Sequence, residues 1–220
     1  MKYVVLQRLA LSACAAALVA GALTACIPLV IGGAAAGGSL VATDRRTSGA
    51  QLEDEGIELR SVSRIRGNIG ERVHVNVTSY NRQVLLTGEV PTAQDKQLVE
   101  QIVSRVENVS AVVNELAVLG NTSLTQRSSD ALVTGRVKAM LIDAQDLFFN
   151  SFKVVTERGT VYLLGRVTQR EADRGTAVVR ATPGVQKVVR IFEIISEEEL
   201  ARMQPAPAKP QPAASKPLGN

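Results

Sequence analysis

The sequence has no tryptophan, a single histidine and two cysteines, and only 3% of its 220 residues are aromatic. The core must therefore be built from Val, Leu, Ile and Ala, and aromatic platforms for stacking nucleic acid bases are scarce. The histidine, His74, has no second histidine with which to form a catalytic relay, and we expect it on the exposed side of a strand. Both cysteines, Cys14 and Cys26, lie near the N-terminus, so no thiol remains further along for nucleophilic or zinc chemistry.

Phosphate and cation sites also lack support. The glycine-rich run at residues 32–38 precedes the first predicted element, so no glycine loop joins a strand to a helix. Acidic runs at residues 53–55 and 197–199 could bind a cation, but they are predicted to be solvated helix ends. The sequence therefore predicts a protein that is not an enzyme and that uses no metal or cofactor.

The N-terminus has the pattern of a secretory signal. Two basic residues precede an apolar run over residues 9–22, and small residues follow it. From the residues alone, 9–31 could instead form one membrane-spanning anchor. A spanning helix needs about 20 apolar residues, whereas Pro28 and a glycine pair interrupt this run. A signal peptide over residues 1–25 is favoured.

The signal ends in Leu23-Thr24-Ala25-Cys26, which resembles the lipobox of bacterial lipoproteins. The resemblance implies that Cys26 is acylated, with palmitate among its chains, and becomes the mature N-terminus. Such proteins carry three acyl chains, and several chains anchor a protein far more firmly than one. In that family an Asp after the Cys favours the inner membrane. Because Ile27 stands here, the resemblance implies anchoring in the inner leaflet of the outer membrane, facing the periplasm.

Both ends of the mature chain are predicted to lack a folded core. Residues 26–50 are rich in Gly and Ala and are predicted to be a flexible tether, although such a run could also pack as a close helix pair in lipid. Five prolines interleave with Ala, Lys and Gln in residues 203–220, without a periodic apolar face. This composition predicts a disordered tail.

Between these ends the chain repeats itself. The segment VLLTGEV at residues 84–90 reappears as VYLLGRV at residues 161–167, and later positions match at a spacing of 76. A period of this length indicates tandem domains, because solenoid units span about 20 to 50 residues. We expect two domains, residues 51–120 and 128–196, each with its own core.

Each copy contains a predicted hairpin. Val73, Val75 and Val77 alternate with polar residues, which predicts a strand with one solvent-facing side. Asn81 in the first copy and Gly159 in the second suit tight turns. The strand glycines, Gly88 and Gly165, are expected to let a helix approach the sheet closely.

Helices flank each hairpin. One is predicted upstream at residues 54–69 and at 129–142, the latter capped by Ser129 or Asp130. A second follows the hairpin, where Thr92 and Thr168 resemble the start of a capping box. Left-handed C-terminal caps are predicted at Asn108 and Gly184.

The fold follows from this order of elements. The final strand of each copy enters through a helix crossover, so it could pair in parallel with a hairpin strand. We predict an α+β fold of two tandem units in αββαβ order, each a small three-stranded mixed sheet with two helices on one face.

These motifs resemble a known family. Two copies of a strand ending in Leu-x-Gly-x-Val, a Thr-capped helix, and Asn-Val or Gly-Val before a last strand are similar to BON domains. With the lipobox and the Pro-rich tail, the chain resembles the dual-BON outer-membrane lipoproteins of Gram-negative bacteria. That resemblance implies a non-enzymatic role in outer-membrane integrity. In one branch it implies binding of anionic phospholipid through the second unit and enrichment at the division site.

Charge separates the two copies. Residues 51–119 carry seven basic and ten acidic side chains, whereas residues 128–195 carry ten basic and seven acidic. A basic residue near an anionic bilayer gains roughly 1 kcal/mol. If one copy contacts lipid, we therefore expect it to be the second.

The resemblance also suggests where that contact lies. In the lipid-binding branch an aromatic residue dips into the membrane from the helix that opens the second unit, but Ala131 stands at the matching position here. A basic and apolar edge could still lie at the headgroups. Its predicted residues are Leu132, Arg136, Lys138, Met140, Leu141, Phe148 and Phe149.

Two functions remain open. One is binding of anionic phospholipid by the second unit. The alternative is a scaffold for proteins of outer-membrane assembly, the cell wall or division, without direct lipid recognition. Nucleic acid is not an expected partner, because secretion separates the chain from it.

Overall fold

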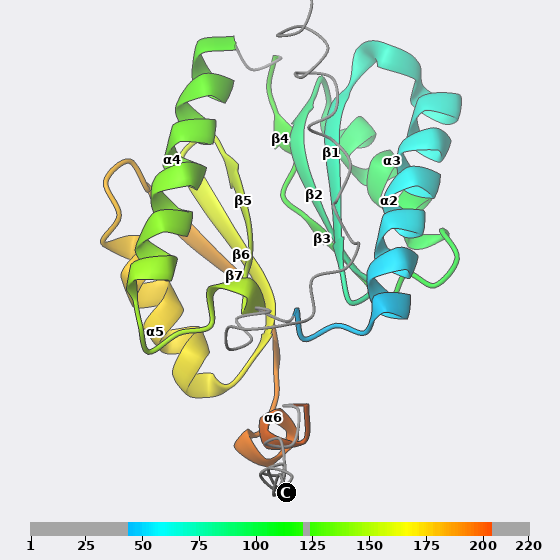
Figure 1. Ribbon diagram of the computed structural model, residues 1–220. Coiled ribbons are helices and arrows are strands. Elements are labelled where there is room, and N and C mark those ends of the chain that lie inside the picture. The colour runs from blue at the N-terminus through cyan, green and yellow to red at the C-terminus, as the bar shows by residue number, and fades with distance from the viewer. Residues whose placement is uncertain (1–43, 121–123, 204–220) are drawn as a thin grey trace, which may run out of the picture. The chain divides into compact units, whose positions relative to one another are not determined.

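The computed structural model describes residues 44–120 and 124–203. The predicted signal peptide, Cys26, most of the predicted tether and the tail from residue 204 lie outside the described residues. Each copy of the repeat forms its own set of helices and strands (Figure 1). Each also has its own hydrophobic core. Residues 44–120 are called the first domain below, and residues 124–203 the second.

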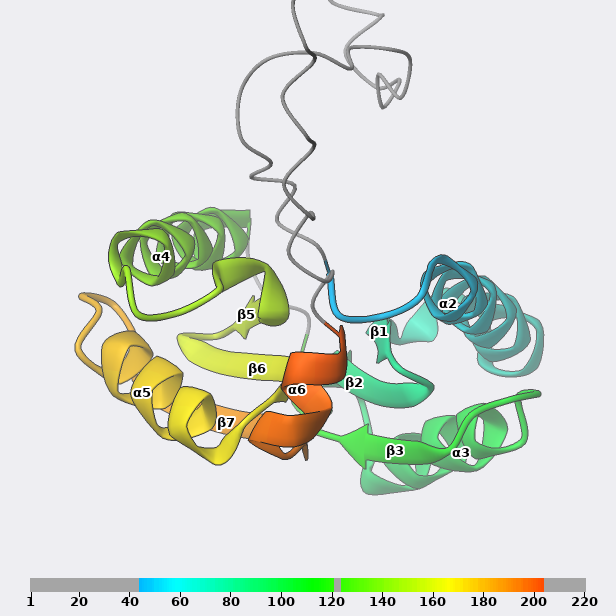
Figure 2. The same cartoon turned by 60° about the horizontal axis from the view of Figure 1, so that its bottom comes forward.

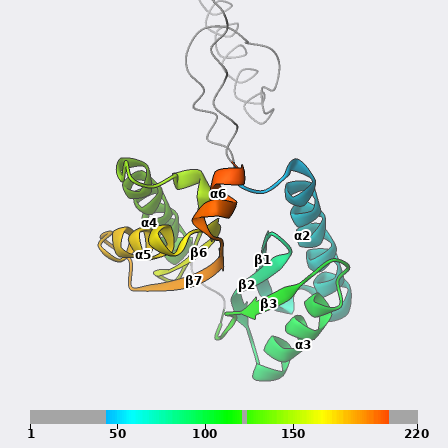
Figure 3. The same ribbon diagram turned by 90° about the horizontal axis from the view of Figure 1, so that it is seen from below.

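The first domain is a hairpin and a split last strand, with two helices on one side of the sheet (Figure 3). Its elements are α2 (Ser48–Ile69), the 3-10 helix η1 (Gly70–Arg72), β1 (His74–Tyr80), β2 (Gln83–Val90), α3 (Ala93–Ser104), β3 (Ala111–Asn114) and β4 (Ala117–Val118). The predicted single last strand is broken between β3 and β4. There Leu116, only 2% exposed, is buried in the core.

The second domain repeats this order with an unbroken last strand. Its elements are α4 (Leu124–Asp143), the 3-10 helix η2 (Phe149–Ser151), β5 (Lys153–Glu157), β6 (Thr160–Val167), α5 (Gln169–Arg180) and β7 (Lys187–Ile194). α4 and α5 cover one face of its sheet (Figure 2). A short helix, α6 (Glu197–Met203), follows β7, and its first turn holds the acidic run at residues 197–199 that was predicted to be a solvated helix end.

Strand pairing confirms the predicted α+β fold. β1 pairs with β2, and β5 with β6, as antiparallel hairpins, while β3, β4 and β7 join in parallel after the helix crossover. Each hairpin closes through two residues of positive φ, Asn81 and Arg82 (48° and 69°) and Arg158 and Gly159 (53° and 72°). This is the geometry of a type I′ turn.

The helices start earlier than predicted. α2 begins at Ser48, capped by Thr47, and α4 begins at Leu124, so neither Ser129 nor Asp130 is a cap. Asn108 and Gly184 do adopt positive φ, but the helices before them end four residues earlier. The prediction of C-terminal caps was therefore wrong.

The capping boxes are confirmed in one copy and partial in the other. The Thr168 hydroxyl accepts the Glu171 N–H, and the Glu171 carboxylate accepts the Thr168 N–H. The Thr92 hydroxyl accepts the Asp95 N–H at 3.0 Å, but the Asp95 carboxylate pairs with Arg72 instead.

Each opening helix contributes a buried aspartate to the hairpin of its own domain. The Asp54 carboxylate accepts the N–H groups of Asn81 and Arg82 at 2.7 and 2.8 Å. Asp130 accepts those of Arg158 and Gly159 at 2.8 and 2.9 Å. The two aspartates are 2% and 6% exposed, so the prediction that the acidic run around Asp54 is a solvated helix end was wrong.

Gly88 and Gly165 are needed because a neighbouring backbone lies too close for a side chain. The prediction that they let a helix approach the sheet was wrong. A Cβ on Gly88 would overlap the carbonyl oxygen of His74, and Gly88 also has a φ of 110°. A Cβ on Gly165 would overlap the carbonyl oxygen of Ser151. Gly88 thus allows the start of β1 to lie against β2. Gly165 allows the segment before β5 to lie against β6.

The sheet faces opposite the helices pack together, and the two domains form one compact unit. A third cluster there joins Tyr80 and Leu85 of the first domain to Tyr162, Leu164 and Ile191 of the second, all at most 5% exposed. The predicted solvent-facing side of β1 is therefore an interface, because polar alternation in a strand does not distinguish water from a second domain.

Candidate functional site

The outer face of α4 carries an apolar crest. Leu132 is 63% exposed and Ile142 57% exposed. Ten residues make about 2.8 helical turns, so the two side chains lie about 80° apart around α4, both on its outer half. Val133 and Val137 point the other way, into the core. α4 thus buries apolar side chains on its core side and also exposes large apolar side chains on its outer side.

Two basic residues flank this crest. Arg136 and Lys138 are exposed and lie on either side of the line from Leu132 to Ile142. Arg136 donates to the Pro183 carbonyl at 3.5 Å. Within the two described ranges, neither Arg136 nor Lys138 forms an ion pair with a carboxylate.

Other basic residues of the second domain are neutralised locally. Arg166 pairs with Glu193 and Glu199, both at 2.9 Å. Arg174 pairs with Asp146 at 2.8 Å. The excess positive charge of the second domain therefore lies on basic residues that pair with no carboxylate among the described residues, and Arg136 and Lys138 of α4 are two of them.

The structure separates the predicted lipid-contact residues into two groups. Leu132, Met140, Phe148 and Phe149 are 39% to 63% exposed, and Arg136 and Lys138 are exposed as well. Leu141 is 1% exposed and belongs to the core, so its place in the predicted set was wrong. The sequence reasoning missed Ile142, because its ten-residue distance from Leu132 is not one of the spacings of three, four or seven residues that mark one helix face.

Phe148 and Phe149 extend this surface beyond the end of α4. They stand at the start of η2, where Phe149 is 39% exposed and Phe148 63%. The Arg45 guanidinium lies 6.0 Å from the centre of the Phe148 ring. The aromatic side chains that α4 lacks at Ala131 are thus present in the loop after it.

The equivalent helix of the first domain has a different outer face. α2 exposes Leu52 and Leu59 by 71% and 73%, but its first three turns carry Glu53, Glu55 and Glu58. Carboxylates beside an apolar crest oppose contact with an anionic surface. The charge difference between the two copies, seen in the sequence, therefore coincides with a difference between two equivalent helices.

His74 is not the exposed strand residue that was predicted. Its Nδ1 lies 3.0 Å from the carboxylate of Glu89, which is fully buried, and Arg158 of the second domain reaches within 4.0 Å of the same carboxylate. Burial and the nearby Glu89 raise the pKa of Glu157 at this edge of the interface. These residues have a structural role, because they line the junction of the two domains.

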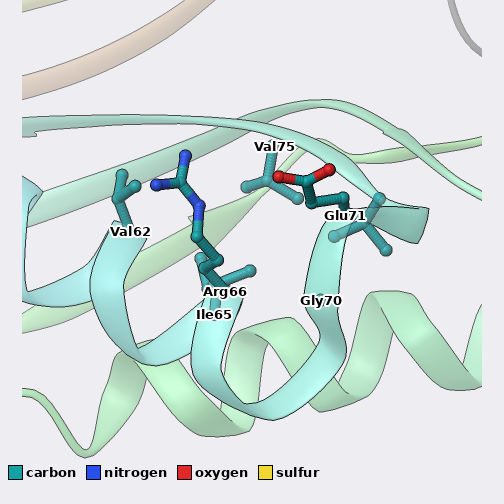
Figure 4. A pocket seen from close by; sticks show the side chains of 7 residues that line it. Val62, Ile65, Arg66, Gly70, Glu71 and Val75 are labelled. Atoms are coloured by element: carbon teal, nitrogen blue, oxygen red, sulfur yellow. The ribbon is translucent and has the colours of Figure 1, made fainter.

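The described chain has two hollows that can be compared with small-molecule pockets. One, of about 240 Å³, lies between α2 and β1 of the first domain, with Val62, Ile65 and Val75 as apolar walls and Arg66 and Glu71 beside them (Figure 4). This volume is below the roughly 300 Å³ at which small-molecule pockets begin. The other, of about 490 Å³, lies between the first hairpin turn and strands β6 and β7, with Asn81, Gly165 and Glu193 in its lining. Among the described residues, no group of three or more His, Cys, Asp or Glu could hold a metal ion.

Within residues 44–120 and 124–203, no helix combines the length and the apolar character needed to cross a bilayer.

Comparison with known proteins identifies the family. The BON domain model matches residues 54–120 and 129–195. The chain is 36% identical to the "Outer membrane lipoprotein DolP" of Haemophilus influenzae over 79% of this chain and 90% of that protein. It is 29% identical to the "21 kDa hemolysin" of Actinobacillus pleuropneumoniae over 69% of this chain and 79% of that protein.

A solved structure of CdsD, a structural protein of the type III secretion system of Chlamydia trachomatis, shares 14% identity. The match covers 64% of this chain and 96% of the CdsD chain, with a TM-score of 0.28. The two matched domains and the similarity to DolP agree with the repeated αββαβ fold described above. The chain therefore belongs to the BON-domain family, in its branch of outer-membrane lipoproteins that carry two such domains.

Proposed function

We propose that this protein is a non-enzymatic lipoprotein, acylated at Cys26 and facing the periplasm, that supports envelope integrity by binding anionic phospholipid through the second BON domain. The observation that carries the proposal is the outer face of α4, where the exposed Leu132 and Ile142 lie between Arg136 and Lys138. An exposed apolar crest between basic residues is the pattern of a helix that lies in the membrane interface.

The expected mode is shallow contact. Ala131 buries much less apolar area than an aromatic residue would, so α4 has no deep anchor of its own. Arg136 and Lys138 together supply about 2 kcal/mol near an anionic surface, or roughly 30-fold in affinity. Phe148 and Phe149, which follow α4 in the chain, expose further apolar area.

Vesicle binding by the unacylated chain tests the site. The chain from residue 26 with Cys26→Ser is incubated with phosphatidylethanolamine vesicles that contain increasing phosphatidylglycerol. Binding should rise with the anionic lipid and fall with salt, because exposed charges are screened. Arg136→Glu with Lys138→Glu should weaken it by at least roughly 30-fold and leave the circular dichroism spectrum unchanged.

The matched control reverses charge on the equivalent helix of the first domain. Arg64→Glu with Arg66→Glu has the same spacing and the same change in net charge, and it should bind vesicles far better than the α4 variant. Equal loss in both variants would show that net charge alone governs binding. Parent-like binding of the Arg136 and Lys138 variant at low salt would show that α4 is not the lipid site.

Acylation at Cys26 has a separate test. In the full precursor, Cys26→Ser should leave an unlipidated and largely unprocessed chain that no longer fractionates with the outer membrane. Normal outer-membrane fractionation of this variant would contradict the proposed anchor.

One observation favours a second candidate function. Leu52 and Leu59 of α2 are the most exposed large apolar residues among those described, and carboxylates surround them. Such a face suits a protein partner better than an anionic bilayer, as in a scaffold for envelope assembly or division proteins. If the parent chain fails to bind anionic vesicles at low salt, this scaffold function replaces lipid binding.

A further inference from the structure

Arg45, at the start of the described chain, is bound by the second domain. Its guanidinium donates two hydrogen bonds to the Glu171 carboxylate, both at 2.7 Å, and a third to the Arg166 carbonyl at 2.9 Å. The Arg45 and Glu171 side chains are 7% and 1% exposed. A bidentate pair with this little exposure is among the stronger side-chain contacts in proteins.

The charge state of Glu171 agrees with this contact. Burial would raise the pKa of Glu171, but the hydrogen bonds from Arg45 and from the Thr168 backbone outweigh it, and the pKa lies below its usual value. Glu171 is also the acidic member of the capping box of α5. Arg45 therefore binds a carboxylate that is already oriented by the second domain.

Arg46, the next residue, is bound by the first domain. Its guanidinium donates to Asp54 at 2.7 Å and lies 4.3 Å from the centre of the Tyr80 ring. Asp54 is the aspartate that also holds the first hairpin turn, through Asn81 and Arg82. Arg46 thus binds residues of the first domain, of which Tyr80 also belongs to the cluster between the two sheets.

Two consecutive side chains therefore bind opposite partners. This arrangement adds polar contacts to the sheet interface, where Leu85 and Leu164 make the apolar contact. It lies directly before α2, which starts at Ser48, and directly after the segment that links the folded part to Cys26.

We propose that Arg45 and Arg46 act as a staple that holds the two BON domains in one arrangement and fixes the membrane tether to the second domain. The tether part of the inference rests on the proposed acylation of Cys26. From Cys26 to Arg45 the chain can span at most roughly 65 Å. Without Arg45 the tether would be attached to the folded part only through the first domain, and the orientation of α4 toward the bilayer would lose this constraint.

Spin-label distances test the staple directly. The chain with Cys26→Ser has no other cysteine after residue 25, so cysteines at Ser63 on α2 and Ala139 on α4 can be labelled specifically. Both positions are exposed. The parent should give one narrow distance distribution, and Arg45→Ala with Arg46→Ala should broaden it or add a second distance.

A matched pair of arginines serves as the control. Arg170→Ala with Arg174→Ala removes two exposed side chains from α5, including the partner of Asp146, and should leave the distribution narrow. If the staple variant stays as narrow as this control, the sheet interface alone holds the domains and the proposal is overturned.

Single variants of Arg45 test whether the start of the folded chain is attached to the second domain. Hydrogen exchange of residues 44–50 should speed up in Arg45→Ala, and Arg45→Lys should restore only part of the protection, because an ammonium cannot donate to both carboxylate oxygens in parallel. Unchanged exchange in Arg45→Ala would contradict the attachment to the second domain. Vesicle binding by the unlabelled parent reports separately on the proposed lipid site, so loss of that function leaves the spin-label result interpretable.

Discussion

Replacing Asp130 by Asn tests whether a buried carboxylate on α4 holds the second hairpin. In the native domain the carboxylate accepts the N–H groups of Arg158 and Gly159 at 2.8 and 2.9 Å and is 6% exposed. Hydrogen bonds to a charged group are worth about 1.5–3 kcal/mol each. An Asn can accept one of these N–H groups, but its NH₂ group would face the other.

The expected loss is therefore about 2–3 kcal/mol of unfolding free energy, from a total of roughly 5–15 kcal/mol for a small domain. Urea unfolding followed by far-ultraviolet circular dichroism, with an unchanged denaturant slope, measures it. Asp146→Asn is the control, because Asp146 makes an exposed pair with Arg174 in which both side chains are 49% exposed. Such pairs contribute up to about 1 kcal/mol.

The first domain supplies an internal comparison. Asp54 accepts the same two turn N–H groups and also the Ser79 hydroxyl at 2.6 Å and the Arg46 guanidinium. Asp54→Asn should therefore cost more than Asp130→Asn. If Asp130→Asn costs no more than Asp146→Asn, water satisfies the turn and the reasoning fails.

Two further predictions concern substitutions of the strand glycines and the pH dependence of the contact between Arg45 and Glu171. Gly165→Ala and Gly88→Ala should each lose about 1–3 kcal/mol or more in the same urea assay, since the added Cβ overlaps a backbone carbonyl, whereas Gly135→Ala, with open space around it, should gain up to about 1 kcal/mol. The pKa of Glu171 is lowered in the folded state, so its contact with Arg45 stabilises the protein above the ordinary value of 4.5 and is lost as pH falls through the folded value. The difference in thermal unfolding temperature between the parent and Arg45→Ala should therefore be full at neutral pH and shrink as the pH falls below 4.5.

The repeated fold could be predicted because local signals agreed in both copies. Alternating valines, a two-residue turn and a Thr before each second helix all indicated the same αββαβ unit. The helix starts were missed because Asp130 sits three residues before Val133, where a capping residue is expected. In the structure its carboxylate binds a turn 28 residues away, a long-range contact that local patterns cannot contain.

The interface between the domains could not be predicted for a similar reason. Tyr80 has polar neighbours in sequence, a pattern that is the same for a solvated face and for a small interface with a polar edge, whereas Tyr162 lies in an apolar run that does not show which face it occupies. The contact between Arg45 and Glu171 could not be predicted either, because the two residues are 126 positions apart and Arg45 lies in a segment predicted to be flexible. Such contacts depend on the placement of whole domains and leave no periodic signal.

The candidate lipid surface shows how one helix carries two separable roles. On its inner side, Asp130 fixes the hairpin and Val137 fills the core, so changes there should alter stability first. On its outer side, Leu132 and Ile142 contact no partner within the core clusters, so changes there should alter binding without altering stability. If α4 binds lipid, Leu132→Ser with Ile142→Ser should weaken vesicle binding while its urea midpoint matches that of the parent. A variant that lost both properties together would show that the outer face is part of the fold and not a surface reserved for a ligand.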